Sequence, residues 1–139
     1  MNQTVETVFP DIAIPSPTYS VAQAPDKDIY IGTESNGLYI YSENWKLKKH
    51  VPIDGIIATI LPDNNGDIWL GLDETGICLF NKNKQTFTWL HKDNTNLNNN
   101  SIRTFVPYGD SSILVGTFRG LNILLSLIHI SEPTRLGMI

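Results

Sequence analysis

The sequence is poor in cysteine, has no long apolar segment and carries no excess of basic residues. Its single cysteine, Cys78, cannot form an internal disulfide and has no neighbour at metal-ligand spacing. No apolar run approaches the roughly 18 residues that a membrane-spanning helix requires. The first residues, MNQTVETVFP, lack the basic and apolar regions of a signal peptide. We therefore expect neither a targeting signal nor membrane contact from this sequence.

The charge balance is acidic, with 14 acidic and 10 basic residues and a net charge of −4. Proteins that bind nucleic acids or anionic membranes through electrostatics carry basic patches instead. We therefore expect no nucleic-acid partner, and a ligand that is small and neutral or a protein. No cofactor is indicated by the composition.

The strongest pattern in the sequence is a motif that occurs three times. Its copies are DIYIGTESNGLYIY, DIWLGLDETGICLF and SILVGTFRGLNIL, which start at residues 28, 67 and 112 and are therefore 39 and 45 residues apart. Sequence repeats of roughly 40 to 50 residues are typical of four-stranded propeller blades. The second unit contains four short strand-like runs, at 56–61, 67–72, 76–81 and 85–91, separated by turn residues.

The sequence therefore predicts an all-β fold, an incomplete and open β-propeller of about two and a half four-stranded blades. The expected divisions are 1–17 as a lead-in or the edge of a preceding blade, 18–54 as the first blade, 55–100 as the second, 101–124 as a partial third and 125–139 as a tail. The first apolar run of each copy ends in glycine, at Gly32, Gly71 and Gly116. We expect these glycines to permit a close strand approach or a bulge.

One stretch has the spacing of a calcium loop. Asp63, Asn65, Asp67 and Glu74 fall at positions 1, 3, 5 and 12 of an EF-hand, but the glycine stands at position 4, as Gly66. The flanking segments are predicted strands instead of helices. We therefore interpret PDNNGD as a hairpin turn and expect no metal site.

The stretch TNLNNNSIRTFVPYGDSSILVGTFRGLNIL resembles the two-component regulator propeller repeat. DNNGDIWLGLDETGI and IYIGTESNGLYIY resemble it in the other units, although Leu72 and Ile77 replace the usual Thr and Leu. The resemblance covers residues 18–124. Its elements in the third unit are Leu97, Asn98 to Asn100, Ile102 to Val106, Gly109, Asp110, Gly116, Thr117, Gly120 and Leu121.

The resemblance implies a sensor. Proteins with these repeats are typically hybrid two-component histidine kinases, whose periplasmic propellers detect oligosaccharides and whose kinase and DNA-binding domains lie inside. A parent of this kind would be homodimeric and anchored in the inner membrane, and this chain would be a periplasmic, non-enzymatic segment of it. The other propeller blades of the parent would then be its partners.

The candidate ligand-binding residues lie on the loops that join second to third strands and on the connections between blades. Side chains there that suit sugar recognition combine aromatic faces with planar polar groups. Asp73 and Glu74 have an alternative interpretation as solvated loop charges, and Arg103 as half of a structural ion pair. The three tryptophans are expected to pack between blades. The candidates are Arg103, Phe118, Arg119, Asp73, Glu74 and His91.

Two other functions remain open at this point. Propellers also serve as scaffolds for protein docking, because a fold does not define a function. Some propellers are lyases or hydrolases that use a histidine and acidic residues. No unit places a histidine beside a carboxylate at a position that the repeat shares.

The tail is a different kind of sequence. Residues 125–135, LSLIHISEPTR, are similar at all eleven positions to a translated transposase adapter from sequencing libraries. We therefore expect the natural sequence to end near Leu124, and His129 then needs no functional explanation. The alternative is a natural C-terminal strand, SLIHI, followed by a turn.

Overall fold

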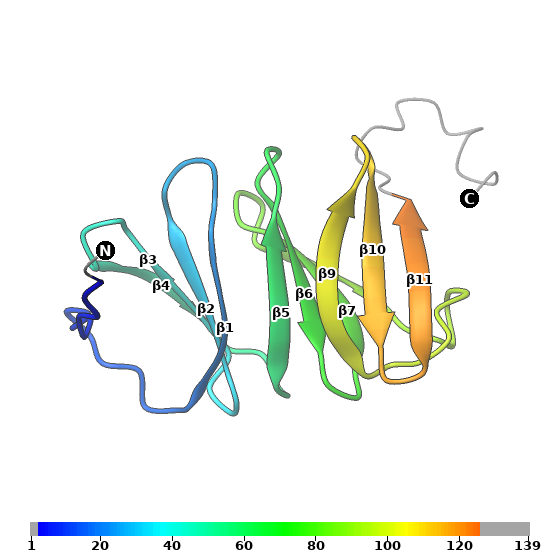
Figure 1. Cartoon of the computed structure of the whole chain (residues 1–139), viewed down its shortest axis with the longest axis horizontal. Helices are drawn as coiled ribbons and strands as arrows, with labels where there is room; N and C mark the ends of the chain where they lie inside the picture. The colour runs from blue at the N-terminus through cyan, green and yellow to red at the C-terminus, as the bar shows by residue number, and fades with distance from the viewer. Residues whose placement is uncertain (1–2, 126–139) are drawn as a thin grey trace.

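The structure, a computed structural model, describes residues 3–125 and contains eleven strands in three antiparallel sheets (Figure 1). Each sheet is a meander in which consecutive strands are neighbours. Blade 1 contains β1 (Thr18–Gln23), β2 (Ile29–Thr33), β3 (Leu38–Tyr41) and β4 (Leu47–Val51). Blade 2 contains β5 (Ile57–Pro62), β6 (Asp67–Leu72), β7 (Gly76–Asn81) and β8 (Thr86–Leu90). Blade 3 contains β9 (Ile102–Tyr108), β10 (Ser112–Thr117) and β11 (Gly120–Leu125).

The three sheets stack face to face as an open β-propeller fragment, as the repeat predicts. Tyr30 and Leu38 of blade 1 pack against Leu70 and Phe80 of blade 2 in one apolar core. A second core forms between blades 2 and 3 and includes Trp69. Alternate residues of each strand point to opposite faces of its sheet, so every strand of blade 2 contributes to both cores or to their rims. No helix in the described part of the chain is long and apolar enough to cross a membrane.

A glycine near the end of the second strand, Gly32 in blade 1 and Gly71 in blade 2, lies where the next blade comes closest. An added Cβ at Gly32 would stand 2.6 Å from Cγ2 of Ile57, the first residue of β5. Strand pairing is also irregular opposite these glycines, with a register shift between Ile57 and Thr59. Both the close approach and the bulge that the sequence predicts are therefore present.

The three tryptophans differ in their packing. Trp69 is 3% exposed between blades 2 and 3, which confirms the expectation for that residue. Trp45 packs on the other side of blade 1, beside Tyr41 and Ile14. Trp89 is 37% exposed, so its predicted burial between blades is wrong. It lies on the outermost strand of its blade, at the rim of the core instead of inside it.

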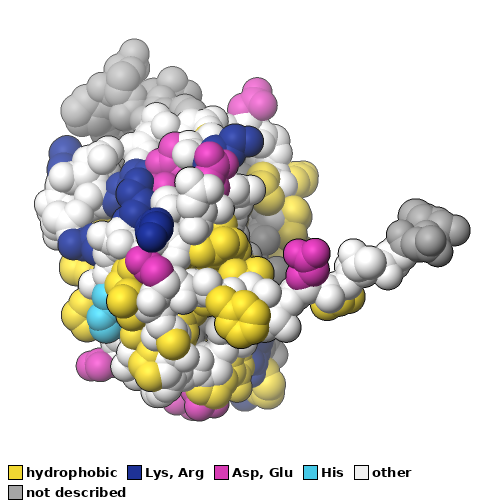
Figure 2. Space-filling view, turned by 90° about the vertical axis from the view of Figure 1, so that its left-hand side faces the viewer, with side chains coloured by type: hydrophobic (Ala, Val, Ile, Leu, Met, Phe, Trp, Pro, Cys, Tyr) yellow, Lys and Arg dark blue, Asp and Glu magenta, His cyan; other side chains and the backbone are white. Residues whose placement is uncertain are grey.

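The segment that precedes β1 covers part of the free face of blade 1. The Tyr41 hydroxyl donates to the Ile12 carbonyl at 2.5 Å, and the Leu47 amide donates to Asp11 Oδ1 at 2.8 Å. Figure 2 looks at this end of the molecule and shows hydrophobic side chains in the open among charged ones. In blade 3, Leu125 is the last residue of β11 and pairs with Ser112 of β10. The rest of the adapter-like segment, including His129, lies outside the described residues.

Candidate functional site

The loops divide between the two ends of the blades. The β1–β2, β5–β6 and β9–β10 hairpins lie at one end, which is the top of Figure 1. The turns β2–β3, β6–β7 and β10–β11 lie at the opposite end, together with the connections from one blade to the next. We call this second end the loop face. All six predicted ligand-binding residues lie on it or at its margin.

Three of the six residues form one cluster between blades 2 and 3. Asp73 follows β6, Arg103 is the second residue of β9 and Phe118 follows β10. Arg103 Nη2 lies 3.9 Å from Asp73 Oδ1, and Arg103 Cζ lies 5.6 Å from the centre of the Phe118 ring. Ser101 Oγ also donates to Asp73 Oδ1, at 2.5 Å. The structure therefore brings together residues that are 45 positions apart in the sequence (73 to 118).

The cluster is open to solvent. The side chains of Arg103 and Asp73 are 50% and 25% exposed, and Phe118 is 68% exposed. An ion pair this exposed contributes about 1 kcal/mol or less to stability. The ion pair matters more for the arrangement of the side chains, because the Asp73 carboxylate and the Phe118 ring both contact the Arg103 guanidinium group. The arrangement presents an aromatic face beside planar hydrogen-bond donors, a combination that suits a hydroxyl-rich ligand.

The other predicted residues are not part of this cluster. Arg119 is fixed through its backbone, whose amide donates to Thr117 Oγ1 at 3.1 Å. Glu74 occupies a left-handed position in the β6–β7 turn, with φ of 74°. Within the described residues, neither side chain has a hydrogen bond or an ion pair. For Glu74 this matches the alternative of a solvated loop charge, and Arg119 stays a predicted ligand-binding residue outside the cluster.

His91 lies on the other side of blade 2, just after β8. Its Nδ1 accepts a hydrogen bond from the Asp93 amide at 3.3 Å and stands 4.0 Å from the Asp93 carboxylate. It lines a groove of about 680 Å³ that Phe87 and Trp89 also line. Neither aromatic residue is among the predicted ligand-binding residues. The signal was present in the alternation of TFTWLH, which places both aromatics and the histidine on one side of an outer strand.

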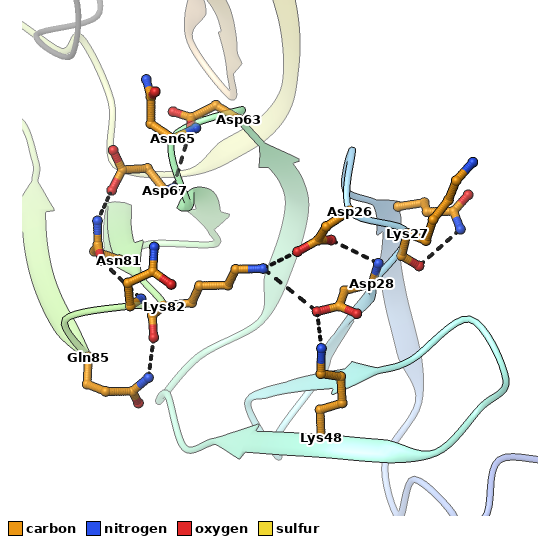
Figure 3. A network of polar contacts seen from close by, with 12 residues as sticks. Asp26, Lys27, Asp28, Lys48, Asp63, Asn65, Asp67, Asn81, Lys82 and Gln85 are labelled. Carbon is orange, nitrogen blue, oxygen red and sulfur yellow. Dashed lines mark hydrogen bonds and ion pairs between the residues drawn. The ribbon is translucent and has the colours of Figure 1, made fainter.

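The stretch with calcium-like spacing is a turn, as expected. Asp63 Oδ1 accepts the backbone amides of Asn65 and Asp67, at 2.8 and 3.2 Å, and Asn81 donates to Asp67 (Figure 3). Glu74 lies beyond the other end of β6. In the described part of the chain, no three His, Cys, Asp or Glu side chains are grouped as metal ligands would be.

An ion-pair network joins blades 1 and 2 at the end opposite the loop face (Figure 3). Lys82, after β7, pairs with Asp26 and lies 3.7 Å from Asp28, which also pairs with Lys48 at 2.8 Å. The hydrogen bond from Lys82 is the main cause that lowers the pKa of Asp26. Burial lowers the pKa of Lys82, but its contacts with Asp26 and Tyr30 outweigh this effect and raise it.

A cavity of about 320 Å³ lies beside this network, lined by Asp26, Tyr30, Asp63 and Lys82 among others. The Tyr30 hydroxyl is buried and has no hydrogen-bond partner within the described residues. Burial raises the pKa of this phenol. Polar side chains, among them Asp26, Asp63 and Lys82, line part of the cavity, which is large enough for an ordered water that would satisfy the hydroxyl.

No protein-family model matches the sequence, and no curated protein matches it. Several solved structures are similar to the chain. The extracellular domain of the proposed hybrid two-component system BT3049 from B. thetaiotaomicron is 33% identical over 78% of this chain, with a TM-score of 0.58. PorZ, a surface component of the type-IX secretion system of Porphyromonas gingivalis, is 16% identical over 91%, with a TM-score of 0.75.

A third neighbour is the extracellular domain of the proposed one-component system BT4673 from B. thetaiotaomicron, 21% identical over 76% of this chain with a TM-score of 0.63. The chain spans only 14% of the BT3049 structure, 20% of PorZ and 16% of the BT4673 structure. The likeness to PorZ and BT4673 therefore establishes the propeller fold alone. The BT3049 structure, which shares more of its sequence with this chain than these two do, is an extracellular domain of a proposed hybrid two-component system.

Proposed function

We propose that this chain is a segment of the extracytoplasmic sensor propeller of a hybrid two-component signalling protein, and that it binds an oligosaccharide at the loop face. The observation that carries the proposal is the 33% identity with the BT3049 extracellular domain, reinforced by its agreement with the repeat motifs. In this proposal the chain itself has no catalytic role. The parent protein is a homodimeric histidine kinase of the inner membrane, and this segment lies in the periplasm.

The Asp73, Arg103 and Phe118 cluster is the proposed contact with the sugar. A pyranose ring has an apolar C–H face and equatorial hydroxyls at its edge. Phe118 offers a flat surface to the first, and Arg103 and Asp73 offer donors and acceptors to the second. Because the cluster joins β6, β9 and β10, a ligand held there would contact two blades at once.

Other blades of the parent are the proposed partners of blade 3. In blade 2, the register row Leu61, Trp69 and Leu79 faces blade 3 and packs in the second core. The equivalent row in blade 3 consists of Leu114 and its register partners Val106 and Ile123. Val106 is 49% exposed and Ile123 is 57% exposed. A face that is buried in one repeat and open in the next is expected to receive another blade.

Protein docking is the alternative function, because exposed loop faces of propellers can also bind proteins. A lyase or hydrolase is a weaker alternative. Within the described residues, the only histidine near a carboxylate is His91, whose pairing with Asp93 is exposed and at the outer margin of the blade. The enzyme alternative predicts turnover of a polysaccharide, whereas the sensor proposal predicts binding without cleavage.

The test is sugar binding by the 139-residue chain, immobilised at low density for surface plasmon resonance and exposed to a panel of defined hexasaccharides. Arg103→Ala should weaken binding roughly tenfold or more, because hydrogen bonds from charged groups contribute about 1.5 to 3 kcal/mol. Lys84→Ala, which removes an exposed cation between β7 and β8 at the end opposite the loop face, is the control and should leave the affinity unchanged. Absence of binding to every sugar in the panel, by chain whose buried Cys78 thiol is protected from iodoacetamide, would refute the oligosaccharide proposal. Equal effects of the two variants would refute the assignment of the cluster.

A further inference from the structure

Two aromatic side chains on the outer strand of blade 2 are exposed without a packing reason. Phe87 and Trp89 alternate along β8 and pair with Phe80 and Cys78 of β7, which belong to the core between blades 1 and 2. The Phe80 and Phe87 rings lie 5.1 Å apart at 30°. Phe87 is nevertheless 44% exposed and Trp89 37%. Large aromatic surfaces in the open commonly mark binding sites.

A missing blade does not explain this exposure. The aromatic residues lie on the side of blade 2 that faces blade 1, and blade 1 is present. Val106 and Ile123 differ in this respect, because they face the open side of blade 3. The repeat does not require an aromatic surface here either. His50 occupies the register position of Trp89 in blade 1, opposite Tyr39, and it stacks on that ring at 4.3 Å.

Phe87 and Trp89 form one wall of the groove of about 680 Å³, a volume suited to a small ligand. Pro52 and Ile53, on the connection from blade 1 to blade 2, also line it and extend its apolar wall. Its polar groups are few and belong to different segments; they are Asp54, Thr75 and His91. Nδ1 of His91 faces Asp93, and Nε2 makes no hydrogen bond within residues 3–125.

We propose that this groove is a second carbohydrate subsite and that it takes a neutral pyranose. This inference rests on the proposed function. The aromatic wall fits the apolar face of a sugar ring, and Asp54, Thr75 and His91 provide acceptors and donors for its hydroxyls. No Lys or Arg side chain lines the groove. A sulfated or uronic acid residue would therefore meet Asp54 without a compensating cation.

The β6–β7 turn places this subsite next to the first one. Asp73 and Thr75 belong to the same turn, and Asp73 contacts Arg103 of blade 3 while Thr75 lines the groove toward blade 1. The two sites therefore lie on opposite sides of one turn of blade 2. An oligosaccharide crossing that turn would occupy both, and a single sugar would occupy one.

The experiment compares Trp89→Ala, Trp89→Phe and Tyr108→Ala in the immobilised 139-residue chain. The probes are neutral gluco-, xylo- and mannohexaose and an oligogalacturonate of the same length. Tyr108 is the control because it is an exposed aromatic residue of blade 3 at the end opposite the loop face. Trp89→Ala should weaken the binding of a neutral hexasaccharide roughly tenfold, Trp89→Phe should retain most of it, and Tyr108→Ala should not change it.

Far-ultraviolet circular dichroism and its loss in urea check that each variant is folded, because the described chain consists of three antiparallel sheets. Unchanged neutral-sugar affinity in Trp89→Ala would overturn the subsite while leaving the proposed function intact. Binding that depends on Trp89 only for the oligogalacturonate would also overturn the inference. If no probe binds the unaltered chain, the proposed function fails first and the subsite fails with it.

Discussion

Gly71 and Ile102 are in contact across the interface between blades 2 and 3, and the contact requires that position 71 have no side chain. An added Cβ there would stand 2.4 Å from Ile102 Cγ2 and 2.6 Å from Thr59 Cγ2. Gly32 and Ile57 have the same relationship one blade earlier. Blades 2 and 3 thus each begin with a residue that rests on the second-strand glycine of the preceding blade, so the spacing between blades is set at these contacts.

Gly71→Ala should destabilise the chain by about 1 to 3 kcal/mol, the usual cost of forcing extra atoms into a packed site. In an Ile102→Ala background the same change should cost less, because the atom that the new Cβ meets is gone. Thr59 would prevent full compensation. Urea unfolding followed by tryptophan fluorescence measures both effects, since Trp69 lies in the same core. Equal costs in the two backgrounds would show that the glycine contact does not set the spacing.

The open face of blade 3 should limit the behaviour of the isolated chain. We expect poor solubility or weakly cooperative unfolding, because Leu121 and Ile123 are 65% and 57% exposed. Replacing both with threonine should raise the monomeric fraction in size-exclusion chromatography. Leu79→Thr, at the partly buried position equivalent to Ile123, should instead lower stability because Leu79 packs against the core between blades 2 and 3. A sharp monomeric melt of the unaltered chain above about 60 °C would contradict this expectation.

The ion pair between Lys82 and Asp26 should make the stability of the fold depend on pH in the acidic range. The pKa of Asp26 is lowered below 3.8 by Lys82, so the carboxylate stabilises the fold above that value and this contribution disappears as the pH falls through the lower, folded-state pKa. Lys82→Met should therefore lower the urea midpoint at about pH 7 and have a smaller effect at about pH 2. Lys84→Met, which removes an exposed lysine of the same turn, is the control. An equal loss at both pH values would exclude the ion pair as the cause.

Cys78 should be inert in the folded chain. It is fully buried, and burial raises the pKa of its thiol to about 12, so almost no thiolate exists near neutral pH. Iodoacetamide at about pH 8 should label it only after urea is added, as mass spectrometry can measure. Rapid labelling without urea would show that the core between blades 1 and 2 opens readily.

Much of the fold could be predicted because the repeat appears three times and each copy fixes a strand pair. The hairpin at PDNNGD and the role of Gly71 follow from local rules of turns and strand spacing. An ion pair of Arg103 could be anticipated only as one of two alternatives, and its partner Asp73 could not, because the pairing depends on how two blades meet. The exposure of Trp89 could not be predicted from its type, which favours burial. It depends on how far blade 1 extends over an outer strand.

The measurement that tests the central claim most directly is long-read sequencing of the source DNA across the codons for residues 120–139. The sensor account predicts that the same gene encodes further blade repeats, then a membrane-spanning segment and a histidine kinase. A gene that encodes a polysaccharide lyase or hydrolase and no kinase would contradict it.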